Sequence, residues 1–304
     1  MYIIASKPKI TFKKRKYRSH IYPKQQQKMQ NNTDHKKMIQ NGFDTVAAGY
    51  DHPSLSFFPE TAKRLVEHLE LEQLNHTPGQ HLLDVCTGTG VVALTAAEKL
   101  TQGKVTGIDL SSGMLQQAKN KAAEKNLGNT EFKQMDLEHL EFDEATFDIA
   151  TSSFGLFFLE DMTKALSNIS STVKPGGKVA ITSFAGEAFS PMADIFLKRY
   201  EATGREVPPL SWKRQATQEL IEEQFNAVNI TNVNICHEPL GYQMTSASMW
   251  WDVVWNAGWR SLLNQMTAEE QKVFEKEHLE EITEVIGEDG VWFNTEVLIG
   301  VGEK

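Results

Sequence analysis

The stretch that most constrains the fold is residues 81–94, which read His-Leu-Leu-Asp-Val-Cys-Thr-Gly-Thr-Gly-Val-Val-Ala-Leu. Its apolar start predicts a short buried strand, its two glycines predict a turn, and the apolar run after them predicts a helix. Glycine suits such a turn because it adopts positive φ and lets a ligand approach the backbone. The following helix points unpaired N–H groups at the turn, so we expect an anionic group to bind at 87–90.

Two ligand classes use a turn of this kind. From Gly88 the sequence fits G-x-G-x-x-A, a dinucleotide fingerprint, and Asp109 follows 21 positions later to hold a ribose. The second class places an acidic residue before the turn, as Asp84 stands before Cys86 here. The turn alone leaves both an NAD(P)-dependent oxidoreductase and a binder of S-adenosylmethionine (SAM) open.

Strand and helix patterns alternate over the central part of the chain. We expect a parallel sheet covered by helices on both faces, an α/β fold whose strand carboxyl ends share one edge. Beyond residue 185 the pattern loosens into helix and loop over 186–212, a helix over 215–225 and a strand over 228–235. Further along, residues 245–287 are expected to be helical in two segments that divide near residue 266. A closing strand is expected over 291–301. The earlier strands are expected at 81–86, 104–109, 131–135, 147–153 and 178–184.

Composition narrows the class of protein. The 304 residues are 40% hydrophobic and 23% charged, as in ordinary globular proteins. No apolar run approaches the roughly 18 residues of a membrane span, so no integral membrane association is expected. The two cysteines, Cys86 and Cys236, give neither a disulfide framework nor metal-ligand spacing. We therefore expect buried, reduced thiols in a cytoplasmic protein without a metal.

Charge divides the chain unevenly. Residues 1–40 hold 11 Lys and Arg and a single acid, Asp34, whereas the remainder carries a net −19. We predict a basic, disordered tail over 1–40, with Met29 and Met38 as alternative starts. A nucleic-acid or membrane-binding arm and a targeting sequence are the other interpretations of the tail. An N-terminal helical cap is expected over 41–78 and the main domain over 79–304, whose acidic charge argues against nucleic acid.

Further acidic and polar residues follow successive predicted strands. Asp109, Asp136 and the segment 151–155 each stand where a strand ends. Carboxylates at neighbouring strand ends suit a nucleoside, one accepting from ribose hydroxyls and the other from the adenine amino group. Asp84 lies earlier and is expected to fix the turn through backbone N–H bonds.

The ordered motifs resemble those of class I SAM-dependent methyltransferases. The similarity is greatest to the methyltransferase type 11 group and the ubiquinone/menaquinone C-methyltransferases. It covers about residues 43–184 and fades over 185–304. Cys86 stands where the family has glycine, which requires a negative φ at Cys86. The matching segments are Phe43-x-x-x-Ala47-x-x-Tyr50-Asp51, Asp84–Gly90, Ile108-Asp109-Leu110 with Met114, Gln134-Met135-Asp136-Leu137, Ser153–Leu156 and Val173–Gly177.

The resemblance implies a Rossmann-like seven-stranded sheet of order 3-2-1-4-5-7-6, with the seventh strand antiparallel and helical lid insertions at about 186–212 and 240–287. It implies SAM as cofactor and S-adenosylhomocysteine as product, with the methionine carboxylate at the glycine turn. The residues expected to bind the cofactor are Tyr50, Asp84, Cys86, Thr87, Gly88, Gly90, Asp109, Leu110, Met114, Asp136, Leu137 and Ser153.

The methyl acceptor is expected to be a small, partly apolar molecule, and the protein a monomer or homodimer. His52 and His237 are the candidates for a general base, against ordinary solvent-facing histidines. Trp251, Trp255 and Trp259 would share one face of a helix, which predicts either core or an acceptor wall. A binding protein without catalysis is a further alternative. The predicted acceptor contacts are Phe154, Phe157, Trp251, Trp255 and Arg260.

Overall fold

The computed structural model describes residues 32–71 and 78–304, and its centre is a seven-stranded sheet. The strand order is β3-β2-β1-β4-β5-β9-β6, and β9 runs antiparallel to both of its neighbours. This confirms the predicted order, with β9 as the inserted seventh strand. The strands are β1 (His81–Val85), β2 (Lys104–Asp109), β3 (Thr130–Gln134), β4 (Phe147–Ser153), β5 (Val173–Phe184), β6 (Thr231–Glu238) and β9 (Val297–Glu303).

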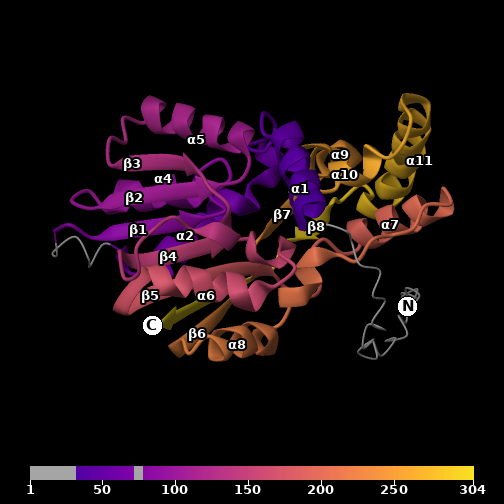
Figure 1. Cartoon of the computed structure of the whole chain (residues 1–304). Coiled ribbons are helices and arrows are strands. Elements are labelled where there is room, and N and C mark those ends of the chain that lie inside the picture. The colour runs from indigo at the N-terminus through magenta and orange to yellow at the C-terminus, as the bar shows by residue number, and fades with distance from the viewer. Residues whose placement is uncertain (1–31, 72–77) are drawn as a thin grey trace, which may run out of the picture.

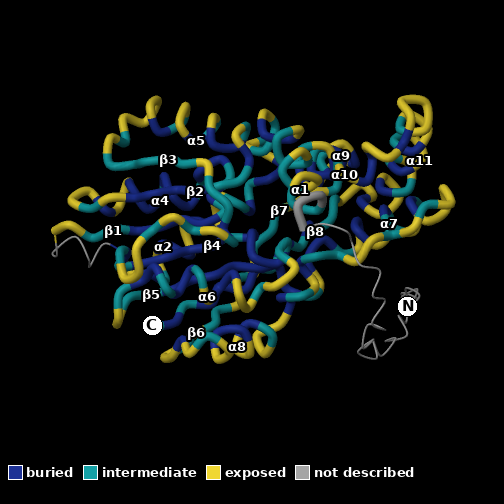
Figure 2. The backbone as a smooth tube through the Cα atoms, viewed as in Figure 1, coloured by how far each residue is buried: buried dark blue, intermediate teal, exposed yellow. Residues whose placement is uncertain are grey.

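Helices cover both faces of this sheet because β1 alternates its buried side chains between them. Leu82 packs into the apolar cluster that includes α2 and α4, whereas Leu83 packs into the cluster that includes α6 and α8. Figure 2 shows that the central strands β1 and β4 are largely buried, whereas the edge strands β3 and β6 are more exposed. Ser111 and Asp161 cap α5 and α6 by accepting from backbone N–H groups of their first turns. These helices are α2 (Phe57–His68), α4 (Val91–Lys99), α5 (Ser112–Glu124), α6 (Met162–Thr172) and α8 (Gln218–Ala227).

A second group of elements lies beyond the carboxyl edge of the sheet (Figure 1). The predicted closing strand 291–301 is wrong in extent, because it divides at Thr295 into two strands of different sheets. Its first part pairs with β7, and only its second part, β9, enters the main sheet. The group comprises α7 (Met192–Ala202), the 3-10 turn η4 (Ser211–Gln215), β7 (Gly241–Met244), α9 (Ala247–Asn256), α10 (Arg260–Leu263), α11 (Ala268–Ile286) and β8 (Val291–Asn294).

Residues 245–287, predicted to form two helices, form three: α9, α10 and α11. Helix α9 stops at Asn256 because Ala257 is extended, with φ −125° and ψ −169°. Gly258, a weak helix former, lies in the break. Trp259 therefore does not continue the face that Trp251 and Trp255 occupy, and that part of the prediction was wrong.

The boundary between the predicted tail and the predicted helical cap also differs from the prediction. Residues 32–40, predicted as tail, belong to helix α1 (Asn32–Val46), which stands at the carboxyl edge of the sheet (Figure 1). The 3-10 turn η1 (Pro53–Leu55) connects it to α2. Residues 1–31, and with them most of the predicted tail, lie outside the described residues. None of the helices within 32–71 and 78–304 combines the length and the apolar composition that a membrane span needs.

Candidate active site

A cavity opens at the carboxyl ends of β1, β2, β3 and β4, beneath α1. It holds about 1130 Å³ of empty space, its mouth included. Of the residues predicted to bind the cofactor, Gly90 alone is absent from its lining. Those that line the cavity are Tyr50, Asp84, Cys86, Thr87, Gly88, Asp109, Leu110, Met114, Asp136, Leu137 and Ser153.

The two glycines of the turn have different tasks. Gly88 has φ 56°, and a Cβ placed there would have no other atom within 4 Å, so its missing side chain leaves room for a ligand. Gly90 has φ 82°, and a Cβ there would lie 2.9 Å from the Cβ of Ala118. Gly90 therefore permits α4 and α5 to pack closely. The expectation that it contacts the ligand is not supported by the cavity lining.

Cys86 departs from the expected backbone conformation. Its φ is 56°, so the prediction of a negative φ at this position was wrong. A left-handed conformation costs a residue with a side chain about 1 kcal/mol or more. Cys86 and Cys236 are free thiols, and both are half-buried rather than buried as predicted. Burial and the nearby Asp109 and Asp84 raise the pKa of the Cys86 thiol, which keeps it protonated.

Asp84 holds the turn mainly through side-chain hydroxyl groups, whereas the prediction was of backbone N–H bonds. Its carboxylate accepts from Thr87 Oγ1 at 2.6 Å, from Thr151 Oγ1 at 2.7 Å and from the backbone N–H of Ala93 at 3.2 Å. Burial raises the pKa of Asp84 to about 6, against these hydrogen bonds. A buried carboxylate with three donors joins β1, β4 and α4 at the point where the chain turns.

Asp109 connects the end of β2 to the same turn. One oxygen accepts from the backbone N–H of Gly88 and the other from that of Ser111, each at 2.8 Å. Burial raises the pKa of Asp109, although these backbone bonds oppose the shift. Each carboxylate oxygen keeps a second lone pair, so Asp109 can also accept from ribose hydroxyls.

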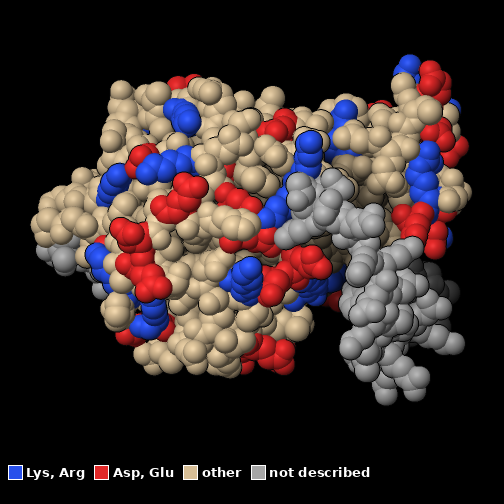
Figure 3. Space-filling view, in the orientation of Figure 1, with Lys and Arg blue, Asp and Glu red and all other residues tan. Residues whose placement is uncertain are grey.

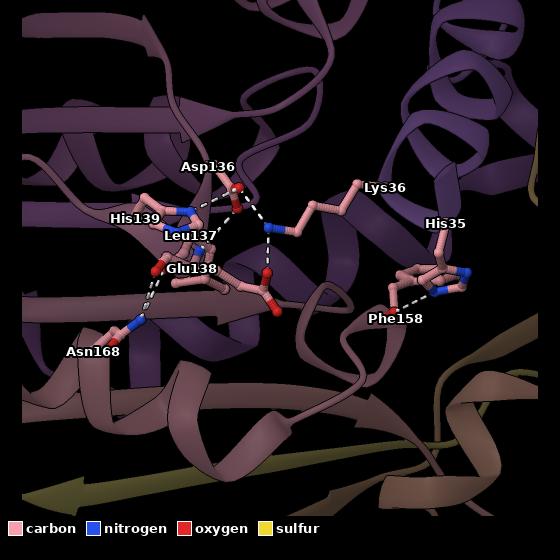
Figure 4. A network of polar contacts seen from close by, with 8 residues as sticks. All are labelled: His35, Lys36, Asp136, Leu137, Glu138, His139, Phe158 and Asn168. Carbon is pink, nitrogen blue, oxygen red and sulfur yellow. Dashed lines mark hydrogen bonds and ion pairs between the residues drawn. The ribbon is translucent and has the colours of Figure 1, made fainter. Parts of the chain in front are cut away.

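Asp136 ends β3 and caps the 3-10 turn η2 (Leu137–His139) by accepting from Glu138 N at 2.9 Å. Its other oxygen accepts from Lys36 Nζ of α1 at 2.6 Å, and Lys36 also pairs with the Glu138 carboxylate (Figure 4). Burial alone would raise the pKa of Asp136, but the bonds from Lys36, Glu138 N and His139 outweigh it and lower the pKa. Asp136 is therefore a charged acceptor at the cavity wall.

Helix α1 contributes contacts that the sequence analysis missed. Asp44 accepts from Ser111 Oγ at 2.5 Å and from Gly113 N at 2.9 Å, and His35 Nε2 donates to the Phe158 carbonyl oxygen at 3.2 Å. The helix is thus held at the ends of β2, β3 and β4. The only signal in the sequence was the Phe-x-x-x-Ala-x-x-Tyr-Asp segment, which includes Phe43. The side chains of α1 that line the cavity are Lys36, Ile39, Gln40 and Phe43.

Five aromatic rings form a continuous wall of the cavity, which we call the aromatic wall. Tyr50 stacks on Phe58 with centroids 5.0 Å apart, and Phe58 meets Phe154 edge-on at 5.3 Å. Phe43 contacts Tyr50 at 6.1 Å and Phe158 at 5.3 Å. Burial and the charges of Asp109 and Asp51 raise the pKa of Tyr50, so its hydroxyl stays protonated.

The other predicted acceptor contacts lie outside the cavity lining. Phe157 and Trp251 are buried in the apolar core. Trp255 is 39% exposed, and the Arg260 guanidinium lies over its ring. Neither candidate base reaches the cavity either. His52 Nδ1 accepts from Ser54 N at the start of η1, and His237, on β6, pairs with Glu296.

Comparison with known proteins identifies the family. A family model described as the ubiE/COQ5 methyltransferase family matches residues 28–214. The chain is 31% identical over 187 residues to aklanonic acid methyltransferase DauC from Streptomyces sp. (strain C5), covering 60% of this chain and 83% of that protein. It is 34% identical over 160 residues to the ubiquinone/menaquinone biosynthesis C-methyltransferase UbiE from Bdellovibrio bacteriovorus, covering 51% and 66%.

A solved structure supports the fold. The YcgJ protein from Bacillus subtilis matches with a TM-score of 0.51 at 20% identity, covering 78% of this chain and 98% of that one. The family match extends over more than half of the chain and includes the glycine turn and all the strand-end acids. This decides against the oxidoreductase interpretation of the turn. The chain belongs to the ubiE/COQ5 methyltransferase family, and S-adenosylmethionine is its methyl donor.

Proposed function

We propose that this protein transfers the methyl group of SAM to a small, flat, partly apolar acceptor bound against the aromatic wall. The observation that carries the proposal is the position of this wall in the same cavity as the glycine turn and the strand-end carboxylates. Aromatic faces favour flat apolar ligands through stacked and edge-on contacts. Relatives named for aklanonic acid and for ubiquinone/menaquinone biosynthesis support a small-molecule acceptor.

The residues of the cavity suit the cofactor. The open position at Gly88 and the N-terminus of α4 fit the methionine carboxylate, Asp109 fits the ribose hydroxyls, and Asp136 fits the adenine amino group. When bound, SAM supplies a methyl group that is already activated. The protein then has to hold the acceptor in line and exclude water, which α1 and the aromatic wall are placed to do.

The ionisable groups of the cavity also limit the acceptor. Asp84, Asp109, Asp136 and Lys36 are engaged in hydrogen bonds, and Cys86 stays protonated. Among the described residues that line the cavity there is no histidine. The described residues that line the cavity therefore provide no strong general base. We infer that the acceptor ionises readily by itself, as an enol or phenol does.

Trp255 and Arg260 lie outside the cavity lining, and their contact with the acceptor stays a prediction. We also propose a reducing, cytoplasmic compartment, which the two free thiols support. Figure 3 shows basic and acidic side chains interspersed over one face of the described residues, a distribution that gives no support to a nucleic-acid partner.

The proposal is tested by calorimetry followed by turnover. SAM and S-adenosylhomocysteine should bind and NADH should not, and a panel of enolic and phenolic acceptors should include a substrate. Phe158→Ala should then raise the KM for that acceptor at least tenfold while SAM affinity changes less than threefold. Phe142→Ala, an aromatic truncation outside the cavity lining, is the matched control. Equal acceptor KM values in wild type and Phe158→Ala would exclude the aromatic wall as acceptor site.

A further inference from the structure

Lys36 joins two distant parts of the chain at the rim of the cavity. It projects from α1 toward η2, one hundred residues away, and contacts both Asp136 and Glu138 (Figure 4). The Lys36 side chain is 17% exposed and that of Glu138 is 10% exposed. An ion pair shielded in this way is screened by salt much less than a surface pair.

The same lysine engages the carboxylate that we assign to the cofactor. Asp136 Oδ2 accepts from Lys36 Nζ at 2.6 Å and from His139 Nδ1 at 3.2 Å, while Oδ1 accepts from Glu138 N. A carboxylate has about four lone-pair directions, so one position, on Oδ1, stays available for a ligand donor. Lys36 therefore helps to fix the orientation of the Asp136 carboxylate, together with Glu138 N and His139.

Lys36 also keeps the cavity covered. Four side chains of α1 line the cavity, so a bound molecule lies partly beneath this helix. Asp44 fixes the far end of α1 to the loop after β2, whereas Lys36 and His35 fix its first turns. The amino-terminal half of α1 lies over part of the cavity, and the Lys36 contacts oppose its movement away from Asp136.

We propose that Lys36 is a positioning residue for the cofactor, which orients Asp136 toward the adenine amino group and, through Glu138, holds α1 closed over that end of the cavity. The inference rests on the proposed role of Asp136. It predicts that Lys36 limits the rate at which SAM and S-adenosylhomocysteine leave. It also predicts that Glu138, which does not line the cavity, affects cofactor release through its ion pair with Lys36.

The experiment measures SAM and S-adenosylhomocysteine dissociation by stopped-flow fluorescence on the full chain. Lys36→Met should increase both dissociation rate constants at least tenfold, and Lys36→Arg should recover most of the difference. Glu138→Gln should increase them severalfold, and the double variant should stay close to Lys36→Met, because the Lys36–Glu138 ion pair is already lost in Lys36→Met. Lys37→Met, an exposed lysine on the same helix, is the matched control and should match wild type.

Two results separate this inference from the assignment of the site. If Asp136→Ala leaves SAM affinity unchanged, the assignment of Asp136 to the cofactor is wrong. If Asp136→Ala weakens SAM binding but Lys36→Met leaves dissociation unchanged, the site stands and the role of Lys36 is overturned. Should Lys36→Met fail to fold, Glu138→Gln decides, and dissociation at the wild-type rate then overturns the inference.

Discussion

The side chain of Cys86 occupies the space that a side chain at position 155 would need. A Cβ placed on Gly155 would lie 2.5 Å from the Cβ of Cys86 and 2.9 Å from its sulfur. Real Cβ contacts are never this close, so the presence of Cys86 requires glycine at 155.

The first prediction follows from this pair. Gly155→Ala should lower the free energy of unfolding by about 1–3 kcal/mol, the usual cost of overpacking, because its methyl group meets Cys86. The double variant Cys86→Gly/Gly155→Ala should recover most of that loss, since glycine removes the obstruction and accepts φ 56°. Urea unfolding of wild type, both single variants and the double variant measures the coupling. A double variant as unstable as Gly155→Ala would contradict the steric account.

The second prediction concerns Asp109. Asp109→Ala should weaken SAM binding by about 1.5–3 kcal/mol, because it removes a charge-assisted acceptor and leaves the Gly88 N–H without its partner. Calorimetric titration with SAM measures the change. Asp143→Ala, at an exposed position, removes the same charge elsewhere and should bind SAM as wild type does. Unchanged affinity in Asp109→Ala would rule out its place in the cofactor site.

The third prediction uses the two internal methionines as chain starts. A chain starting at Met29 keeps all of α1, whereas one starting at Met38 loses Lys36 and the His35 contact. We expect SAM affinity close to that of the full chain in the first and at least tenfold weaker in the second. Calorimetry on both chains decides the matter. Equal affinities would show that the first turns of α1 are dispensable.

The fourth prediction is a pH dependence of stability at His278 of α11. Trp250 Nε1 donates to His278 Nε2 at 2.8 Å, and burial lowers the pKa of His278 to about 4. In the unfolded chain the imidazole of His278 binds a proton as the pH falls below about 6.5, whereas in the folded chain it does so only near pH 4. The contribution of His278 to the free energy of unfolding is therefore fully present above pH 6.5 and is lost as the pH falls toward 4.

Between pH 7.5 and 4.5 this loss should reach about 2 kcal/mol. Glutamine at position 278 keeps an acceptor for the indole but does not titrate. Between pH 7.5 and 4.5 the His278→Gln variant should therefore lose about 2 kcal/mol less unfolding free energy than wild type. Urea unfolding at several pH values gives both curves. The neighbouring charges, Glu281 and Arg199, are the same in both proteins. Parallel curves would show that His278 is already protonated in the folded protein.

The strand-end acids could be predicted from the sequence because their positions follow from local patterns. Asp109 is the last residue of β2, Asp136 follows β3, and Asp84 lies just before the end of β1, and parallel strands bring their carboxyl ends to one edge. No long-range contact had to be known. The place of β9 followed from the family resemblance and was confirmed by its pairing with β5 and β6.

Helix α1 and the tryptophan segment could not be predicted for two different reasons. The sequence of α1 is polar and continues a basic run, so its role depends on contacts such as Lys36–Asp136, which join residues 100 positions apart. In α9 the repeat of Trp251, Trp255 and Trp259 suggested one face, but the helix ends at Asn256. The buried face is instead centred on Trp250, which His278 holds by a hydrogen bond.

The insertion of β9 has a consequence for biosynthesis. Among the described strands β6 has β9 as its one partner in the sheet, and residues 239–296 separate the two strands along the chain. As the chain leaves the ribosome, β6 therefore waits unpaired while residues 239–296 are translated. The region through β5 can assemble earlier, because β1 to β5 pair among themselves. The edge of β5 is therefore open to pairing with other chains until β9 has been translated and inserted.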